Sequence, residues 1–168
     1  PHMPYQPPEP FRSRFSKGAS GSQVEGSIRE TTDMMVEELA PSHPDVIRLL
    51  ELYDGHIAYA DSLIRRSVQA FESTGRSDPP VILVTSDHGE EFAEHGQFNH
   101  SNSLYEEQLR VPLILIPPGK MHLDLPATRS PRPTMSVDVA PTIAQVADAP
   151  VPAAWSGRSL LEPMREAP

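Results

Sequence analysis

The stretch that decides the fold is VILVTSDHGEE, residues 81–91. Its first five residues form a continuous, mostly β-branched run after Pro79 and Pro80, which is typical of a strand buried on both faces. Such strands belong to parallel sheets covered by helices. The polar residues that follow the run therefore lie at the carboxyl end of the strand, where open α/β sheets bind ligands.

A long helix is predicted just upstream, over residues 44–71. Pro44 suits a first helical turn, Ser42 or His43 suits a cap, and Gly75 suits a helix end. Apolar side chains recur at steps of three and four, which predicts one buried stripe made of Leu50, Tyr53, Ile57, Ala60, Ile64, Val68 and Phe71. A helix that feeds a buried strand is an α/β unit, so we predict an α/β domain with this stripe packed on the sheet.

The rest of the chain is less regular. Residues 1–41 are predicted to be largely extended loop, since their first part is rich in Pro, Ser and Gly. The S-x-x-E pattern at 103–106 has the form of a capping box that opens a short helix. Residues 111–116 are predicted to form a second strand. Residues 137–147 are predicted to form a short helix, with one stripe made of Val139, Ile143 and Val146.

Composition narrows the function classes. The 168 residues are enough for one domain with a core. A net charge of −9 with 14 scattered basic residues argues against a nucleic acid or an anionic membrane as partner. No apolar run approaches the roughly 18–20 residues of a membrane span. The sequence has no cysteine, so it offers no thiolate metal site.

The beginning of the sequence carries no start signal. Its first residue is Pro1, not Met, and PHMPYQPPEP is already loop-like. We therefore expect residues 1–168 to be the carboxyl-terminal portion of a longer catalytic domain, whose upstream half lies outside this sequence. The cellular compartment cannot be read from it.

The loop after the first strand carries the candidate chemistry. Asp87 and His88 offer a carboxylate oxygen and an imidazole nitrogen side by side, which suits a divalent cation, and Gly89 permits a tight turn. His95 and His100 follow at spacings of seven and five, without the H-E-x-x-H pattern of zinc sites. From these residues alone, metal or phosphate-like chemistry and plain surface histidines are both open.

Four ordered motifs make the sequence more specific. Residues 85–119 read TSDHGEEFAEHGQFNHSNSLYEEQLRVPLILIPPG, and residues 1–11 read PHMPYQPPEPF. Residues 52–64 read LYDGHIAYADSLI, and residues 136–161 read SVDVAPTIAQVADAPVPAAWSGRSLL. Together these segments resemble the sulfatase family of the alkaline phosphatase superfamily. The resemblance implies an alkaline phosphatase-like, mostly parallel sheet flanked by helices, present here as a partial domain.

The resemblance also implies roles for single residues. Asp87 and His88 would be two ligands of one divalent metal ion, Ca²⁺ first and Mn²⁺ second. His100 would contact a sulfate oxygen. His2 would contact the sulfate and help to protonate the leaving oxygen, so His2 and His100 are the catalytic and substrate-binding candidates. The family gives no firm role to His95. The implied substrate is a small-molecule or carbohydrate sulfate ester.

Two features of the sulfatase pattern are missing from this sequence. Sulfatases use a formylglycine made from Cys or Ser in a C/S-x-P-x-R motif, and the nearest match, Ser130-Pro131-Arg132, is too compressed. The family's paired amino-terminal acidic ligands are absent too. We expect both features upstream and expect the 168-residue chain to be inactive alone. The alternatives are a phosphodiesterase or phosphonate monoester hydrolase of the same superfamily, and a non-catalytic binding domain that retains the fold.

Overall fold

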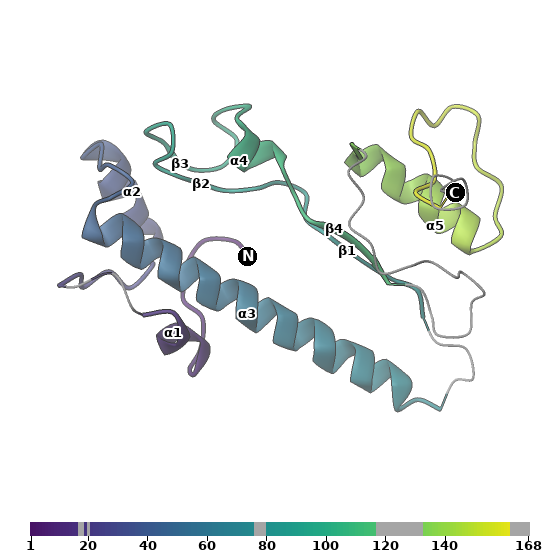
Figure 1. Ribbon diagram of the computed structural model, residues 1–168, viewed down its shortest axis with the longest axis horizontal. Helices are drawn as coiled ribbons and strands as arrows, with labels where there is room; N and C mark the ends of the chain where they lie inside the picture. The colour runs from purple at the N-terminus through teal and green to yellow at the C-terminus, as the bar shows by residue number, and fades with distance from the viewer. Residues whose placement is uncertain (17–18, 20, 76–79, 117–132, 162–168) are drawn as a thin grey trace, which may run out of the picture. The chain divides into compact units, whose positions relative to one another are not determined.

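The structure is a computed structural model that describes residues 1–16, 19, 21–75, 80–116 and 133–161 (Figure 1). The chain divides into two units, and each unit is made of two segments. The first unit contains residues 1–77 and 88–112, and the second contains residues 78–87 and 113–168.

The first unit is built on one long helix. Its elements are α1 (Phe11–Arg14), α2 (Ile28–Val36), α3 (Pro44–Glu72), β2 (Glu91–Phe92), β3 (Phe98–Asn99) and α4 (Glu106–Leu109). The helix predicted over residues 44–71 is confirmed as α3. It begins where predicted because the His43 ring nitrogen Nδ1 accepts a hydrogen bond from the backbone N–H of Asp45, at 3.2 Å. Among the described residues, no helix is both long and apolar enough to cross a membrane.

The buried face of α3 differs in part from the predicted stripe. Its buried apolar side chains are Val46, Leu49 and Leu52. Leu50 and Tyr53 pack against the same core, as predicted. Ile57 and Ile64 are 47% and 36% exposed, so their predicted burial is wrong.

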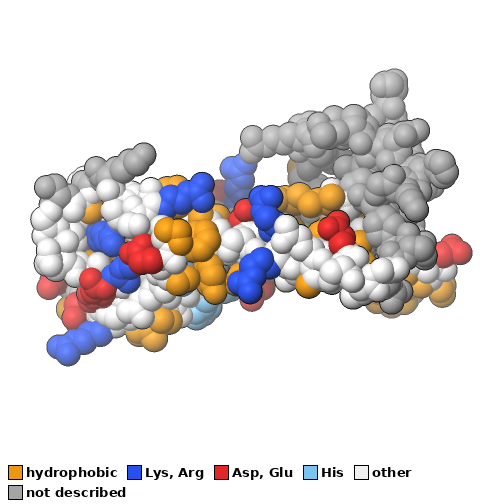
Figure 2. Space-filling model, turned by 90° about the horizontal axis from the view of Figure 1, so that it is seen from below, with side chains coloured by type: hydrophobic (Ala, Val, Ile, Leu, Met, Phe, Trp, Pro, Cys, Tyr) orange, Lys and Arg blue, Asp and Glu red, His pale blue; other side chains and the backbone are white. Residues whose placement is uncertain are grey.

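The reason lies in what covers the helix. At Gly55 the backbone of α1 approaches so closely that a Cβ atom would lie 2.7 Å from the carbonyl oxygen of Phe11. The Phe11 ring then meets Tyr59, with centroids 5.4 Å apart. Farther along α3, apolar side chains reach the surface, and Figure 2 shows hydrophobic and charged side chains interspersed on one face. The helical periodicity was read correctly, but the described first unit does not cover the whole stripe.

Aromatic rings from three segments form the centre of the first core. The Tyr5 ring centroid lies 5.5 Å from that of Tyr53 and 5.5 Å from that of Phe92. The rings of Tyr53 and Phe92 are 4.9 Å apart. The other buried members are Val24, Met34, Val46, Leu49, Leu52, Ala93 and Phe98. The core therefore joins the amino-terminal segment, α3 and the hairpin of β2 and β3.

The first 41 residues hold more structure than the predicted loop. α2 begins with a capping box, in which the Ser27 hydroxyl accepts from the Glu30 backbone N–H and the Glu30 carboxylate accepts from that of Ser27. The Tyr5 N–H donates to the carbonyl oxygen of Gly26 at 2.8 Å. A Cβ atom at Gly26 would lie 2.2 Å from the Tyr5 carbonyl oxygen, so a glycine is required for this approach.

The described part of the second unit contains one two-stranded ladder. Its elements are β1 (Ile82–Thr85), β4 (Leu113–Ile116), the 3₁₀ helix η1 (Ser136–Asp138) and α5 (Val139–Val146). The two strands pair antiparallel, from Ile82 opposite Ile116 to Thr85 opposite Leu113. A parallel partner for residues 81–85 is therefore not among the described residues. β1 is half-buried and ends at the exposed Thr85, so its predicted burial on both faces is wrong, and in the described ladder it has β4 as its single neighbour.

The helix predicted over residues 137–147 is observed as η1 followed by α5. Its buried residues within α5 are Pro141, Thr142 and Ala144. Ile143 belongs to the predicted inner stripe but is 55% exposed, so that part of the prediction is wrong. The buried face of α5 includes Thr142, whose hydroxyl bonds to the segment that follows the helix.

That segment is held by side-chain acceptors of η1 and α5. The Asp138 carboxylate accepts from the backbone N–H of Arg158 at 3.0 Å, and the Thr142 hydroxyl accepts from that of Leu160 at 2.9 Å. A Cβ atom at Gly157 would lie 2.0 Å from a backbone oxygen of η1. The GRSL turn thus packs directly on the VDVAPT helix start.

The observed burial reverses the expectation for two positions of α3, because Leu49 lies outside the predicted stripe but is buried, and Ile57 lies within it but is half-exposed. Replacing Leu49, which is fully buried, by Ala should lower the free energy of unfolding by about 2–5 kcal/mol, the range for large-to-small core changes. Replacing the half-exposed Ile57 by Ala should cost less than about 1 kcal/mol. Chemical denaturation of the protein that carries this sequence measures both, and equal losses would contradict the observed face of α3.

Candidate active site

A short hairpin presents the histidine-bearing loop. β2 and β3 pair antiparallel, and Phe92 and Phe98 anchor them in the first core at 3% and 1% exposure. Glu90 directly precedes β2, and His100 directly follows β3. Because opposite residues of an antiparallel pair face each other, the hairpin brings Glu90 and His100 together.

Gly89 lets the loop lie against α4. Its N–H donates to the carbonyl oxygen of Gln108, and the Glu90 N–H donates to that of Glu107, both at 2.8 Å. A Cβ atom at Gly89 would lie 2.0 Å from the Glu107 carbonyl oxygen. The sequence predicts a tight turn at this glycine, whereas the structure shows that close backbone packing requires it. This packing fixes the position of the neighbouring His88.

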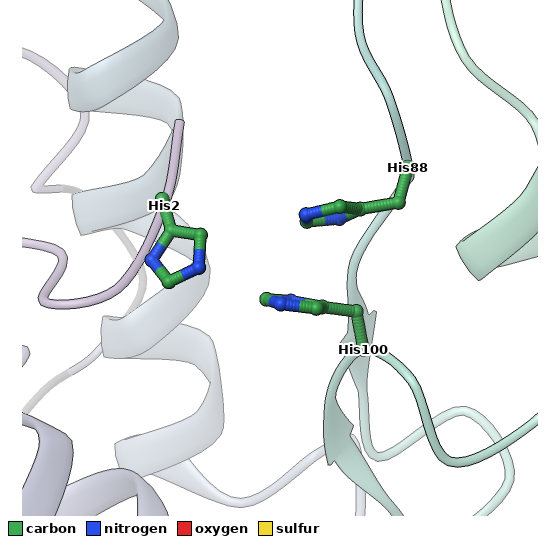
Figure 3. A group of neighbouring side chains, drawn as sticks. All are labelled: His2, His88 and His100. Carbon is green, nitrogen blue, oxygen red and sulfur yellow. The ribbon is translucent and has the colours of Figure 1, made fainter.

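His2, His88 and His100 form one cluster (Figure 3). The rings of His88 and His100 are stacked, with centroids 3.8 Å apart and planes inclined by 24°. The His2 ring meets them edge-on, at 6.1 Å from His88 and 5.0 Å from His100. One ring nitrogen of each histidine lies within 4.8 Å of the others. Three of the four predicted site residues thus lie together, although they come from distant parts of the sequence.

Each ring in the cluster is oriented through its Nδ1 atom. His2 Nδ1 lies 2.8 Å from the carbonyl oxygen of Met3, and His88 Nδ1 lies 2.7 Å from that of Gly89. His100 Nδ1 lies 2.8 Å from the Glu90 carboxylate. Because carbonyl and carboxylate oxygens only accept, each Nδ1 must carry a proton, and in a neutral ring the lone pair is then on Nε2. This is the tautomer of a histidine that binds a metal or accepts a proton through Nε2.

Glu90 and Tyr5 support this cluster and were not predicted as site residues. The Glu90 side chain is 2% exposed, and its second carboxylate oxygen accepts a hydrogen bond from the Tyr5 hydroxyl at 2.6 Å. Burial and then the hydrogen bond to Glu90 raise the pKa of the Tyr5 phenol well above its usual range, so it stays a donor. Both residues lie inside the quoted motifs, and that position was the one sequence signal that pointed to them.

Asp87 directly precedes His88 in the sequence and is the last residue of the first segment of the second unit. Its side chain is exposed, and one of its carboxylate oxygens lies 3.5 Å from the Ser86 hydroxyl. Its predicted role beside His88 as a metal ligand stays a prediction.

A second group of possible ligands consists of Glu91, His95 and Glu107. Glu91 is fully buried, and one of its oxygens accepts from the backbone N–H groups of His95 and Gln97, each at 3.1 Å. The other accepts from the Gln108 side-chain amide at 2.8 Å. Since these bonds already occupy both carboxylate oxygens, we assign Glu91 to holding the loop together and not to binding an ion.

His95 also has a local structural role. Its ring stacks on Tyr105, with centroids 3.5 Å apart and planes inclined by 7°, and its Nδ1 lies 2.5 Å from the Glu107 carboxylate.

The capping box predicted at 103–106 is wrong, because Tyr105 occupies the cap position of α4 without a side-chain bond. The Ser103 hydroxyl instead accepts from the Tyr105 N–H.

The fold of this chain is similar to the folds of two solved structures. It resembles the phosphonate monoester hydrolase SpPMH from Silicibacter pomeroyi with a TM-score of 0.66 at 28% identity, over 94% of this chain and 28% of that chain. It also resembles BT4656 in complex with its substrate D-Glucosamine-2-N, 6-O-disulfate, with a TM-score of 0.52 at 27% identity, over 73% of this chain and 24% of that chain. The predicted α/β, alkaline phosphatase-like class is thereby confirmed for this partial domain.

The sequence identifies the family within that class. The Sulfatase family model matches residues 1–149, and the chain belongs to the sulfatase family. Arylsulfatase K of Bos taurus is 31% identical over 92% of this chain and 24% of its own length. The putative extracellular sulfatase Sulf-1 homolog of Caenorhabditis elegans is 30% identical over 96% of this chain and 23% of its own length. The chain therefore spans about a quarter of the length of these curated relatives.

The bonding of Glu91 leads to a stability prediction. In Glu91→Gln, the side-chain NH₂ group would face donors that now point at a carboxylate, so the free energy of unfolding should fall by about 1–3 kcal/mol. Glu106→Gln, at an exposed position of α4, is the matched control and should change it by about 0.5 kcal/mol or less. A Glu91→Gln variant as stable as this control, but with altered metal content, would show that Glu91 is a ligand after all.

Proposed function

We propose that the protein carrying this sequence is a metal-dependent sulfuric ester hydrolase and that this chain supplies part of its metal- and sulfate-binding site. The observation that supports this most is the cluster of His2, His88 and His100. Its members come from two separate sulfatase motifs, and each ring is held through Nδ1.

The proposed division of labour follows from chemistry and position. Asp87 and His88 would hold the cation, since a carboxylate and an Nε2 lone pair fit a divalent ion. Such an ion would act as a Lewis acid toward the sulfate oxygens. Ca²⁺ prefers six to eight oxygen ligands and is the first candidate, with Mn²⁺ the second. These two residues would then be a minority of the ligands.

The other two histidines would face the substrate. During hydrolysis of a sulfate ester the bond between sulfur and the leaving oxygen breaks, and that oxygen gains negative charge. His2 is exposed and its Nδ1 is held by its neighbour's carbonyl, so with both ring nitrogens protonated it would donate the Nε2 proton to this oxygen. His100 is less exposed, its Nδ1 is bonded to Glu90, and with Nε2 also protonated it would donate a hydrogen bond from Nε2 to a sulfate oxygen. Histidine suits both tasks because its pKa lies near neutrality.

A phosphonate monoester hydrolase is the second candidate, because the SpPMH structure shares this fold at 28% identity. Both reactions displace a leaving oxygen from a tetrahedral centre with charged peripheral oxygens. A cation and imidazole donors therefore serve either reaction equally. The remaining parts of the site decide between them.

Turnover assays test the proposal directly. With the purified protein that carries this sequence, we expect kcat/KM for para-nitrophenyl sulfate to exceed that for a phosphonate monoester and for a phosphate diester. A preference for the phosphonate would favour the second candidate. No turnover of any of the three by metal-loaded protein would favour a non-catalytic domain.

Metal analysis tests the division of roles. Asp87→Asn and His88→Ala should each reduce bound metal and lower kcat/KM by more than the roughly tenfold to hundredfold loss typical of outer-sphere partners. His2→Ala should lower kcat but leave the metal content unchanged. If His2→Ala and His100→Ala remove the metal as fully as His88→Ala, the three imidazoles bind the ion together, and the proposed division is wrong.

A further inference from the structure

Glu90 holds His100 by a direct contact between their side chains. Its carboxylate is almost fully buried and has two hydrogen bonds, one to His100 Nδ1 at 2.8 Å and one from the Tyr5 hydroxyl at 2.6 Å. His2 and His88, in contrast, are oriented by backbone carbonyls next to them in the chain. His100 therefore depends on a side chain ten residues away for its orientation.

The two bonds of Glu90 act together on the His100 ring. An ionised carboxylate only accepts hydrogen bonds, so it requires a proton on His100 Nδ1. Tyr5 occupies the second carboxylate oxygen and is itself fully buried, which prevents the carboxylate from rotating away. The stacked ring of His88 limits His100 on one face. Together these contacts restrict His100 to one orientation and to a protonated Nδ1.

We propose that Glu90 is a positioning residue for His100 and that Tyr5 fixes Glu90 in this role. The inference rests on the proposed function, in which His100 donates to a sulfate oxygen. Positioning partners of this kind matter because a small displacement of a donor weakens its bond to the charge that develops during reaction. Glu90 touches neither substrate nor cation in this account.

The contact between this loop and α4 supplies a matched control. His95 and Glu107 form a second histidine–glutamate pair, with Nδ1 2.5 Å from the carboxylate. That histidine stacks on Tyr105, not on the cluster. Removing the Glu107 carboxylate therefore breaks the same kind of bond, between this loop and α4, without changing the support of His100.

The first arm of the experiment is kinetic. Glu90→Gln in the protein that carries this sequence should lower kcat for para-nitrophenyl sulfate by about tenfold to hundredfold, with KM nearly unchanged, because the amide can turn its NH₂ group toward His100. Glu107→Gln should leave kcat within about twofold of the original protein. A Glu90→Gln enzyme as active as the Glu107→Gln enzyme would overturn the proposal.

The second arm does not depend on turnover. In protein labelled with isotopically enriched histidine, the imidazole nitrogen resonances of His100 should show a protonated Nδ1, and Glu90→Gln should shift this pattern while Glu107→Gln leaves it unchanged. An unchanged His100 pattern in Glu90→Gln would overturn the proposal. If the original protein cleaves no sulfate ester but its His100 responds in this way, the proposed function fails and the positioning contact stands.

Tyr5→Phe keeps the proposal testable if Glu90→Gln does not fold. The ring remains to fill the core, and only the hydroxyl is lost, so the protein should fold. We expect kcat to fall by roughly twofold to tenfold and the His100 nitrogen resonances to broaden, because Glu90 then has a single anchor. Unchanged kcat and unchanged resonances in Tyr5→Phe would contradict the role assigned to the pair.

Discussion

The burial of one tyrosine connects the parts of the first unit. Tyr5 packs its ring against Tyr53 of α3 and against Phe92 of the hairpin, and its backbone bonds to Gly26. Its hydroxyl then reaches Glu90. One side chain therefore brings the amino-terminal segment, the long helix and the histidine-bearing loop to a common point. His2, three residues before it, joins His88 and His100 as a consequence.

The sequence predicted the elements of the fold better than their surroundings. The helix starting at Pro44 could be located because its start signals and its periodicity depend on neighbouring residues. Burial of Ile57 could not, because periodicity shows which side of a helix can be covered and not which residues of this chain cover it. The strand predicted at residues 81–85 is confirmed as β1, but its described partner is antiparallel, since a continuous apolar run does not specify the direction of the neighbouring strand.

The candidate site shows the same limit at the level of single side chains. Family motifs pointed to His2, His88 and His100, and the structure places all three together. Glu90 and Glu91 are adjacent acidic residues in the same motif. Both are buried, and because adjacent residues at a strand start point to opposite sides, each carboxylate meets different partners. Tyr5 and His100 form hydrogen bonds with the Glu90 carboxylate, and the loop amides donate to the Glu91 carboxylate. Counting the charged residues of the sequence does not reveal these partners.

The hydrogen bonds of the two units also differ in the number of residues that separate their partners in the sequence. Asp138 to Arg158 and Thr142 to Leu160 span 20 and 18 residues, whereas Tyr5 to Glu90 spans 85. Loop-closure entropy in a flexible chain costs about 0.6 kcal/mol for each doubling of length. Closing the chain between Tyr5 and Glu90 therefore costs roughly 1 kcal/mol more than closing the turn after α5. The hydrogen bond that anchors the buried Glu90 carboxylate is therefore far less local than the hydrogen bonds that hold the GRSL turn. Contacts between residues so distant in sequence raise the contact order, and high contact order slows folding.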